Sequence, residues 1–243
     1  MVERATPQRI VVIGAGGIGA PLAWALIEAG ASALTLVDED MVELGNLHRQ
    51  VLFEERDVGR PKTLALAERL RALRPGVDVL TIEGRALPGT VMSLVLGAGV
   101  VVDATDNFPS RFLLADAAHL ASVPIVHAAA VRWQATVLAV PPGGGPCYRC
   151  LFEDVPTGPA PDCATAGVVG SVCGVAGALA ADHALCLLEG DASVGGRIVT
   201  YDGLSDRLRS VPIRARSGCI LCGDSQEILA IDIERYTRGG ACA

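Results

Sequence analysis

The chain has 243 residues, 51% hydrophobic and 19% charged, so it can bury a large core within one α/β domain. A net charge of −7 and a pI near 5.1 argue against a nucleic-acid or anionic-membrane surface, because both need a basic face. The first residues lack the apolar core of a signal peptide, and the most apolar helix candidate, 167–188, carries Asp182 and His183. We therefore expect a cytoplasmic protein whose partners are small molecules or proteins, with no nucleic acid and no membrane.

Apolar runs alternate with helical patterns over the first 130 residues, which predicts a parallel sheet with helices on both faces. Strands are expected at 10–13, 34–37, 77–82, 100–103 and 124–129, and helices at 19–29, 61–73, 90–97 and 109–121. The pattern then changes to a strand at 135–140, a helix at 167–188 and a hairpin of 197–201 with 207–213. The expected fold is a Rossmann-like, doubly wound, mostly parallel α/β sheet with an appended antiparallel part.

A glycine-rich turn follows the first predicted strand. Gly14, Gly16, Gly17 and Gly19 precede a helix, and Asp38 ends the next strand. Glycine lets backbone N–H groups approach a phosphate closely, a helix N-terminus adds positive charge, and an acid can hold ribose hydroxyls. This motif alone is typical of any dinucleotide-binding βαβ unit, so a nicotinamide-dependent oxidoreductase stays open at this point.

A polar segment and a lone lysine come next. Asn46, Arg49 and Gln50 lie close together in the chain, and Lys62, the only lysine, opens the second predicted helix. That helix N-terminus would aim Lys62 at the cleft. Two cations beside a phosphate loop suit a reaction that expels pyrophosphate better than a hydride transfer. The alternative is that both are ordinary surface charges.

Two polar residues, Asp106 and Asn107, follow the strand at 100–103. Ligands of open α/β sheets bind at the carboxyl ends of strands, so both residues should face the same crevice as the glycine turn. Asp106 is a candidate Mg²⁺ ligand, because Mg²⁺ takes one or two carboxylates together with phosphates and water. Either residue could instead cap the helix that follows.

Two Cys-x-x-Cys pairs, Cys147 with Cys150 and Cys219 with Cys222, predict a metal site. Four thiolates complete a closed tetrahedral Zn²⁺ site, which is structural because it leaves no open coordination position. Residues 151–218 separate the pairs, so the metal would tie two distant segments together. A redox role is the alternative for either pair taken alone.

Together these motifs resemble the ThiF/MoeB/HesA family of ubiquitin-activating-enzyme-like adenylyltransferases, in the expected order over residues 9–223. The resemblance implies that the C-terminal glycine carboxylate of a ubiquitin-like sulfur carrier protein, ending in diglycine, attacks the α-phosphate of ATP. It also implies a homodimer. No rhodanese-like domain follows residue 223, so we expect a separate sulfur donor. Within one domain, 1–243, we expect a nucleotide-binding part at about 9–130, a carrier-binding and zinc part at about 131–223, and a tail at 224–243.

The resemblance also assigns roles to the nucleotide-site residues. Arg49, Lys62 and Mg²⁺ at Asp106 would neutralise phosphate charge while Asp38 orients the ribose. No general base is required, because a carboxylate attacks already ionised. The rest of the nucleotide shell would be Asn46, Gln50 and Asn107 together with the glycine turn.

Cys163 lies in a loop just ahead of the helix at 167–188, where exposure and thiolate character are favoured. Residues 162–170 resemble the thiamine-pathway members more than the molybdopterin-pathway ones, and the matching cysteine of the former takes part in sulfur transfer. Cys163 is therefore a candidate acyl- or persulfide-linked nucleophile, and the alternative is an unreactive loop thiol.

Several readings of the function stay open beside thiamine-pathway adenylation. They are a molybdopterin-pathway adenylyltransferase, activation of a small-molecule or tRNA carboxylate, an oxidoreductase and an inactive nucleotide-binding scaffold. Family members usually carry an N-terminal Arg-Tyr-x-Arg-Gln arm whose arginine reaches the nucleotide of the neighbouring subunit. The residues ahead of the first predicted strand lack this motif, so another group replaces that cation, a partner supplies it, or the activity is weak.

Overall fold

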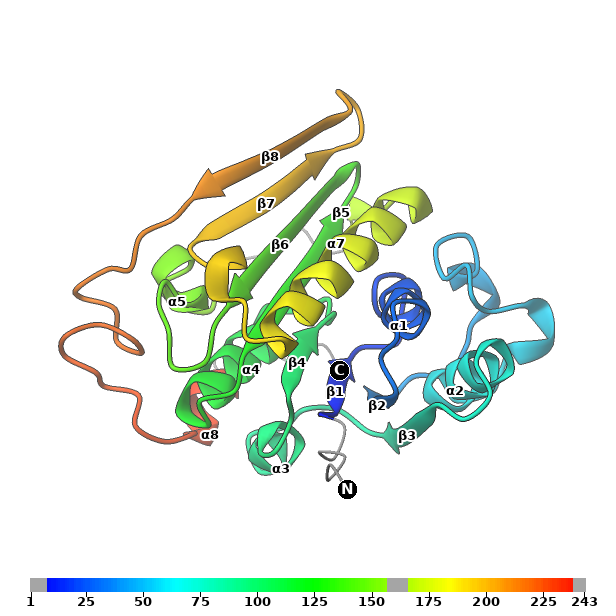
Figure 1. Cartoon of the computed structure of the whole chain (residues 1–243), viewed down its shortest axis with the longest axis horizontal. Helices are drawn as coiled ribbons and strands as arrows, with labels where there is room; N and C mark the ends of the chain where they lie inside the picture. The colour runs from blue at the N-terminus through cyan, green and yellow to red at the C-terminus, as the bar shows by residue number, and fades with distance from the viewer. Residues whose placement is uncertain (1–7, 157–165, 238–243) are drawn as a thin grey trace, which may run out of the picture.

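One mixed sheet forms the centre of the molecule in a computed structural model that describes residues 8–156 and 166–237 (Figure 1). Over these residues its strand order is β3-β2-β1-β4-β5-β6-β7-β8. The strands are β1 (Ile10–Ile13), β2 (Ala33–Asp38), β3 (Asp78–Glu83), β4 (Val100–Asp103), β5 (Ile125–Val131), β6 (Gln134–Val140), β7 (Arg197–Asp202) and β8 (Arg207–Pro212). Strands β1 to β5 pair in parallel and β6 to β8 are antiparallel, which confirms the predicted fold class.

Helices cover both faces of this sheet and enclose two hydrophobic cores. The α-helices are α1 (Gly19–Glu28), α2 (Lys62–Leu73), α3 (Val91–Val95), α4 (Phe108–Leu120), α5 (Tyr148–Leu151), α7 (Gly170–Leu188) and α8 (Ile233–Thr237). Short 3-10 turns are η1 (Leu44–Asn46), η2 (Glu55–Asp57) and η3 (Ala192–Val194). One core lies under α1, α2 and α7, and the other lies under α3, α4, α5 and α8.

The strand order reverses at β1, which pairs with β2 on one side and β4 on the other. Every residue of β1 and β4 is buried, as expected for parallel strands with helices on both faces. In open α/β sheets the crevice at such a switch point binds ligands at the carboxyl ends of the strands. The loops that follow Ile13 and Asp103 therefore flank the same crevice.

Helix α7 is 19 residues long and, within the described chain, is the one helix apolar enough to cross a membrane by length and composition. It instead packs within the fold against α1, β4, β5 and β6 (Figure 1). Its small residues allow this close packing, since a Cβ at Gly177 would lie 2.9 Å from the Ile18 carbonyl oxygen. Helix α7 is thus a core helix, as its Asp182 and His183 led us to expect.

The segment expected to be a tail, 224–243, is described to residue 237. Its helix α8 packs against α4, and Ile228 and Tyr236 are buried in the second core. The Tyr236 hydroxyl donates a 2.8 Å hydrogen bond to Asp116 of α4. This part of the chain therefore contributes to the packed protein.

Candidate functional site

The glycine turn between β1 and α1 is too tight for side chains. Gly14 has a φ of +95°, in the left-handed region, and its N–H donates to the Val37 carbonyl at 2.8 Å. A Cβ at Gly19 would lie 1.8 Å from the Gly14 oxygen, so the start of α1 touches the turn directly. Such a turn brings the backbone within reach of a phosphate at the helix N-terminus.

Asp38 holds the glycine turn from the end of β2. Its Oδ2 accepts the Ala15 N–H at 2.6 Å, and its Oδ1 accepts the Asp40 N–H at 2.8 Å. Burial raises the pKa of Asp38 above its usual value, although nearby Lys62 and the two N–H groups pull it down. A carboxylate accepts about four hydrogen bonds, so Asp38 retains the capacity to accept a ribose hydroxyl.

Lys62 begins α2 and is only 5% exposed, which excludes the reading of an ordinary surface charge for this residue. Its Nζ donates to Asp40 Oδ2 at 2.6 Å, and its backbone N–H donates to the Asp40 carbonyl at 3.0 Å. Asp40 was not predicted to be the partner of Lys62. Three consecutive acids, Asp38 at the end of β2 and the two that follow it, indicated that an ion pair could form there, without indicating which acid would form it.

The polar segment after η1 packs against the glycine turn. The Asn46 carbonyl accepts the N–H groups of Arg49 and Gln50, and a Cβ at Gly17 would lie 3.2 Å from the Arg49 carbonyl oxygen. Gln50 is 3% exposed, and its Oε1 has no hydrogen-bond partner among the described residues. The Arg49 guanidinium is half-buried and lies 3.5 Å from His48, without a carboxylate partner in the described chain. Both side chains therefore have bonding capacity for a ligand.

The loop after β4 lies on the other side of the turn. Ala104 donates its N–H to the Ile13 carbonyl, and a Cβ at Gly14 would lie 2.7 Å from the Ala104 oxygen. Asn107 caps α4 by accepting the Ser110 N–H at 3.0 Å, as the capping alternative predicted. Asp106 is exposed and pairs with none of the described residues, so its free carboxylate fits the chemistry of a Mg²⁺ ligand.

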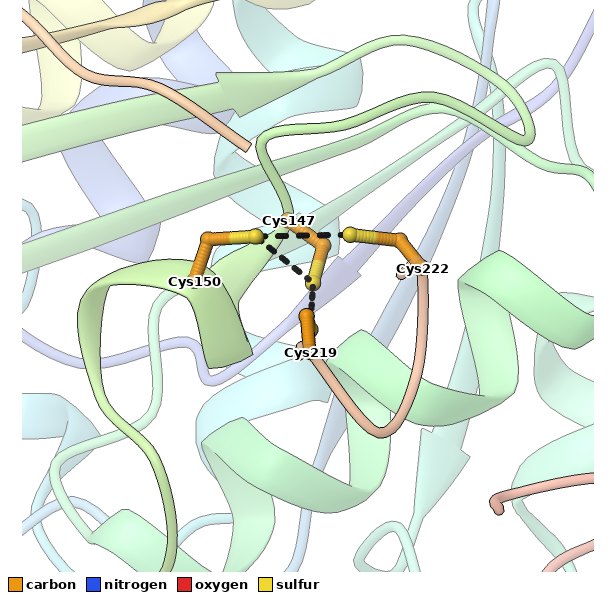
Figure 2. A group of neighbouring side chains, drawn as sticks. All are labelled: Cys147, Cys150, Cys219 and Cys222. Carbon is orange, nitrogen blue, oxygen red and sulfur yellow. Dashed lines mark hydrogen bonds between the residues drawn. The ribbon is translucent and has the colours of Figure 1, made fainter. Parts of the chain in front are cut away.

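The four cysteines of the two Cys-x-x-Cys pairs converge, with their sulfurs turned toward one another (Figure 2). All four Sγ atoms lie within 4.8 Å of one another, with Cys147 to Cys219 at 3.5 Å and Cys150 to Cys222 at 3.3 Å. A tetrahedron with Zn–S bonds of about 2.3 Å has sulfur separations of about 3.8 Å. This donor set fits a structural zinc ion.

The thiols of this cluster differ in acidity. Burial opposes ionisation of Cys219, but N–H groups of Cys222 and Leu221 that face its sulfur lower its pKa to about 7. Burial raises the pKa of Cys222 to about 11. Since a metal binds thiolates, its binding at this cluster would release protons.

Comparison with known proteins identifies the family. The sequence profile of the ThiF family matches residues 2–221. This chain belongs to the ThiF family. The match covers the glycine turn, the loop with Asp106 and the first three cysteines of the cluster.

Curated relatives of this ThiF-family chain are similar over most of its length. The SAMP-activating enzyme E1 of Haloferax volcanii is 42% identical over 224 residues, which cover 91% of this chain and 82% of that protein. The sulfur carrier protein adenylyltransferase of Thermus thermophilus is 41% identical over 229 residues, covering 91% and 84%. The sulfur carrier protein ThiS adenylyltransferase of Escherichia coli is 38% identical over 224 residues, covering 92% and 89%.

Among solved structures, the ThiF-family fold is shared with MccB of E. coli. Its crystal structure with ATP aligns with a TM-score of 0.77 and 23% identity, over 89% of this chain and 67% of that one. At this identity the likeness shows the fold. It agrees with the doubly wound sheet described above.

Asp103 forms a buried hydrogen-bond network that was not predicted from the sequence. Its Oδ2 accepts His127 Nδ1 at 2.7 Å, and its Oδ1 accepts the Thr105 N–H and hydroxyl at 3.0 and 2.6 Å. Burial favours the neutral carboxyl, but Arg111 and His127 hold the pKa of Asp103 below its usual value. The sequence signal that could have revealed this network is a polar residue in each of two apolar strands, Asp103 in β4 and His127 in β5.

Arg149, inside the first Cys-x-x-Cys pair, joins the cysteine cluster to α4. It is fully buried, and its Nε and Nη2 each donate a 2.8 Å bond to Asp116, which is also fully buried. Tyr236 donates to the same carboxylate, and Arg216 Nη2 donates to the Arg149 carbonyl. This polar network adjoins the candidate metal site and holds Arg149, between Cys147 and Cys150, in place.

Two features remain to be described. Cys163 lies outside the described residues. A hollow of about 430 Å³ lies where β6 begins beside the β7–β8 turn. It is lined by Val131, Arg132, Trp133, Gln134, Asp202 and Leu204.

Proposed function

We propose that this chain catalyses ATP-dependent adenylation of the C-terminal carboxylate of a sulfur carrier protein. The observation that carries the proposal is the convergence on one glycine turn of three segments, which carry Asp38, Gln50 and Asp106. The names of the relatives at about 40% identity support the same reaction.

In this reaction a carboxylate oxygen of the carrier forms a bond to the α-phosphorus of ATP, and the bond from that phosphorus to the β-phosphate oxygen breaks. The products are an acyl-adenylate and pyrophosphate. Lys62 and Arg49 would neutralise the charge that builds up on the departing phosphates. Mg²⁺, held by Asp106, would supply further charge neutralisation.

The other residues of the shell would bind and orient ATP. Asp38 would accept a ribose hydroxyl, since its carboxylate keeps unused lone pairs beside the glycine turn. The unpaired Gln50 Oε1 and the Asn46 side chain would complete the polar contacts.

The carrier would dock on the second part of the chain. The hollow beside Trp133 and Leu204 belongs to this part, and both side chains are exposed, at 42% and 74%. A diglycine tail has no side chains and could thread from there toward the crevice. Exposed apolar residues Met41, Leu44 and Val51 flank the Asn46 segment and suit the expected homodimer.

The four thiolates would hold a structural Zn²⁺, which suits a reducing compartment such as the cytoplasm.

We place the enzyme in sulfur incorporation for thiamine synthesis, with a separate sulfur donor. In this scheme the Cys163 thiolate displaces AMP from the acyl-adenylate and forms a thioester. A Cys163→Ser variant that still supports sulfur transfer would remove this residue from the mechanism.

The decisive experiment is ATP–pyrophosphate exchange with and without candidate diglycine-ended carriers. Wild type should exchange only with a carrier, and Lys62→Ala and Asp106→Ala should abolish the exchange. Arg56→Ala removes a nearby exposed cation that pairs with the exposed Glu54, and it should leave exchange intact. Exchange unaffected by the first two changes would refute the assigned roles. Exchange without any carrier would point to a small-molecule or tRNA carboxylate.

A further inference from the structure

His127 is a buried histidine that no step of the proposed adenylation uses. It lies on β5 opposite Asp103 of β4, and it is 3% exposed. The ionised Asp103 carboxylate can only accept, so the 2.7 Å contact requires that His127 Nδ1 donate. Its Nε2 has no partner in the described chain. Burying an imidazole ring with one unpaired nitrogen lowers the stability of the fold. This indicates that the hydrogen bond from His127 to Asp103 serves a structural or functional role.

That hydrogen bond sets the direction of the Asp103 carboxylate. With Oδ2 held by His127, Oδ1 points at Thr105 and accepts both its N–H and its hydroxyl. Arg111 donates to the Thr105 carbonyl and, at 2.9 Å, to the Ala128 carbonyl. Thr105 is therefore held at its N–H, its hydroxyl and its carbonyl oxygen.

These contacts fix Thr105, which precedes Asp106, while the cap of α4 fixes Asn107, which follows it. Asn107 accepts the Ser110 N–H at 3.0 Å. The Asp106 carboxylate itself bonds to none of the described residues. Its backbone is thus held on both sides although its side chain is free to bind a ligand. Groups behind a metal ligand commonly orient it, and their loss weakens metal binding.

We propose that His127, Asp103 and Arg111 are positioning residues that fix the loop at 104–107 so that Asp106 meets the Mg²⁺ of MgATP. This inference rests on the proposed function. Without the His127 donor, the nearest remaining cation to Asp103 Oδ2 is Arg111 Nη1, now 3.8 Å away. The carboxylate would turn toward Arg111 and away from Thr105, and the loop would lose its anchor.

The test measures ATP binding by calorimetric titration, with Mg²⁺ and with EDTA. For His127→Leu we expect the Mg²⁺-dependent gain in affinity to fall about tenfold, with metal-free binding unchanged. His127→Asn keeps a side-chain N–H donor and should retain the gain. His183→Leu is the matched control, because His183 is also buried with an unpaired nitrogen but lies on α7, outside this network. The Mg²⁺ concentration for half-maximal pyrophosphate exchange should rise in parallel.

Three results would overturn the inference. They are an unchanged Mg²⁺-dependent gain in His127→Leu, an equal loss of metal-free binding, and a failure of His127→Asn to retain the gain. If His127→Leu does not fold, Thr105→Val removes only the hydroxyl bond and should cause a smaller loss of the same sign. A wild type without carrier-dependent exchange would count against adenylation, while the binding comparison would still decide the network. A wild type that shows carrier-dependent exchange but no Mg²⁺-dependent gain in affinity would overturn the inference and leave adenylation standing.

Discussion

The buried pair of Arg149 and Asp116 allows a sharp prediction about stability. An Arg149→Met variant removes both 2.8 Å bonds and leaves the Asp116 carboxylate buried with the Tyr236 hydroxyl as its remaining partner. Breaking a buried ion pair on one side costs about 3–5 kcal/mol, because the other charge stays buried. Since Tyr236 still donates, we expect a cost of about 3 kcal/mol, near the lower limit of this range.

Urea unfolding, at matched zinc content, measures this cost. With a slope of about 3 kcal/mol per molar urea, the midpoint should fall by about 1 M. A double variant, Arg149→Met with Asp116→Leu, removes both charges and should recover most of the loss. Arg85→Ala breaks an exposed pair with Glu39 and should leave the midpoint nearly unchanged. A cost below about 1 kcal/mol for Arg149→Met, or a double variant as unstable as the sum of the single ones, would refute this reasoning.

Removing the metal with a chelator should lower the melting temperature and expose four thiols to a thiol reagent, since the cluster joins two segments; an unchanged melting temperature would contradict a structural metal. Gly19→Ala should abolish ATP binding in a titration, because its Cβ would lie 1.8 Å from the Gly14 oxygen, whereas Gly174→Ala has open space and should bind normally. The lowered pKa of Asp103 means that its charge stabilises the fold above about pH 3.9, and that this contribution is lost as the pH falls through the lowered value. In urea unfolding, the difference in free energy of unfolding between wild type and Asp103→Asn should therefore stay constant from pH 7 to 5 and disappear below pH 4. A difference that disappears near neutral pH would contradict the lowered pKa of Asp103.

Features of the fold that depend on nearby residues were predictable from the sequence. The bounds of β1 and β4 match the expected strands, because an apolar run between turn residues is a local signal. Helix α2 begins at Lys62, one residue after the position expected from Pro61. The glycine turn and its contact with Asp38 follow from motif spacing, since a βαβ unit brings the ends of adjacent strands together.

Contacts between distant parts of the chain were not predictable in the same way. The pairing of Asp103 with His127 depends on the register of β4 and β5, which no single strand specifies. The pairing of Arg149 with Asp116 joins α5 to α4 across the second core. Periodicity indicates which positions are buried, but the partner of a buried charge is set by three-dimensional packing.

The long separation of the two cysteine pairs constrains the order of events during synthesis. Cys147 and Cys150 leave the ribosome well before Cys222, and residues 151–218, which form α7, β7 and β8, come between them. A nascent chain can therefore offer only two of the four sulfurs of this cluster until all strands of the sheet have been translated. Capture of the ion by all four sulfurs would then be a late maturation step, in which the newly made protein competes with cellular zinc buffers.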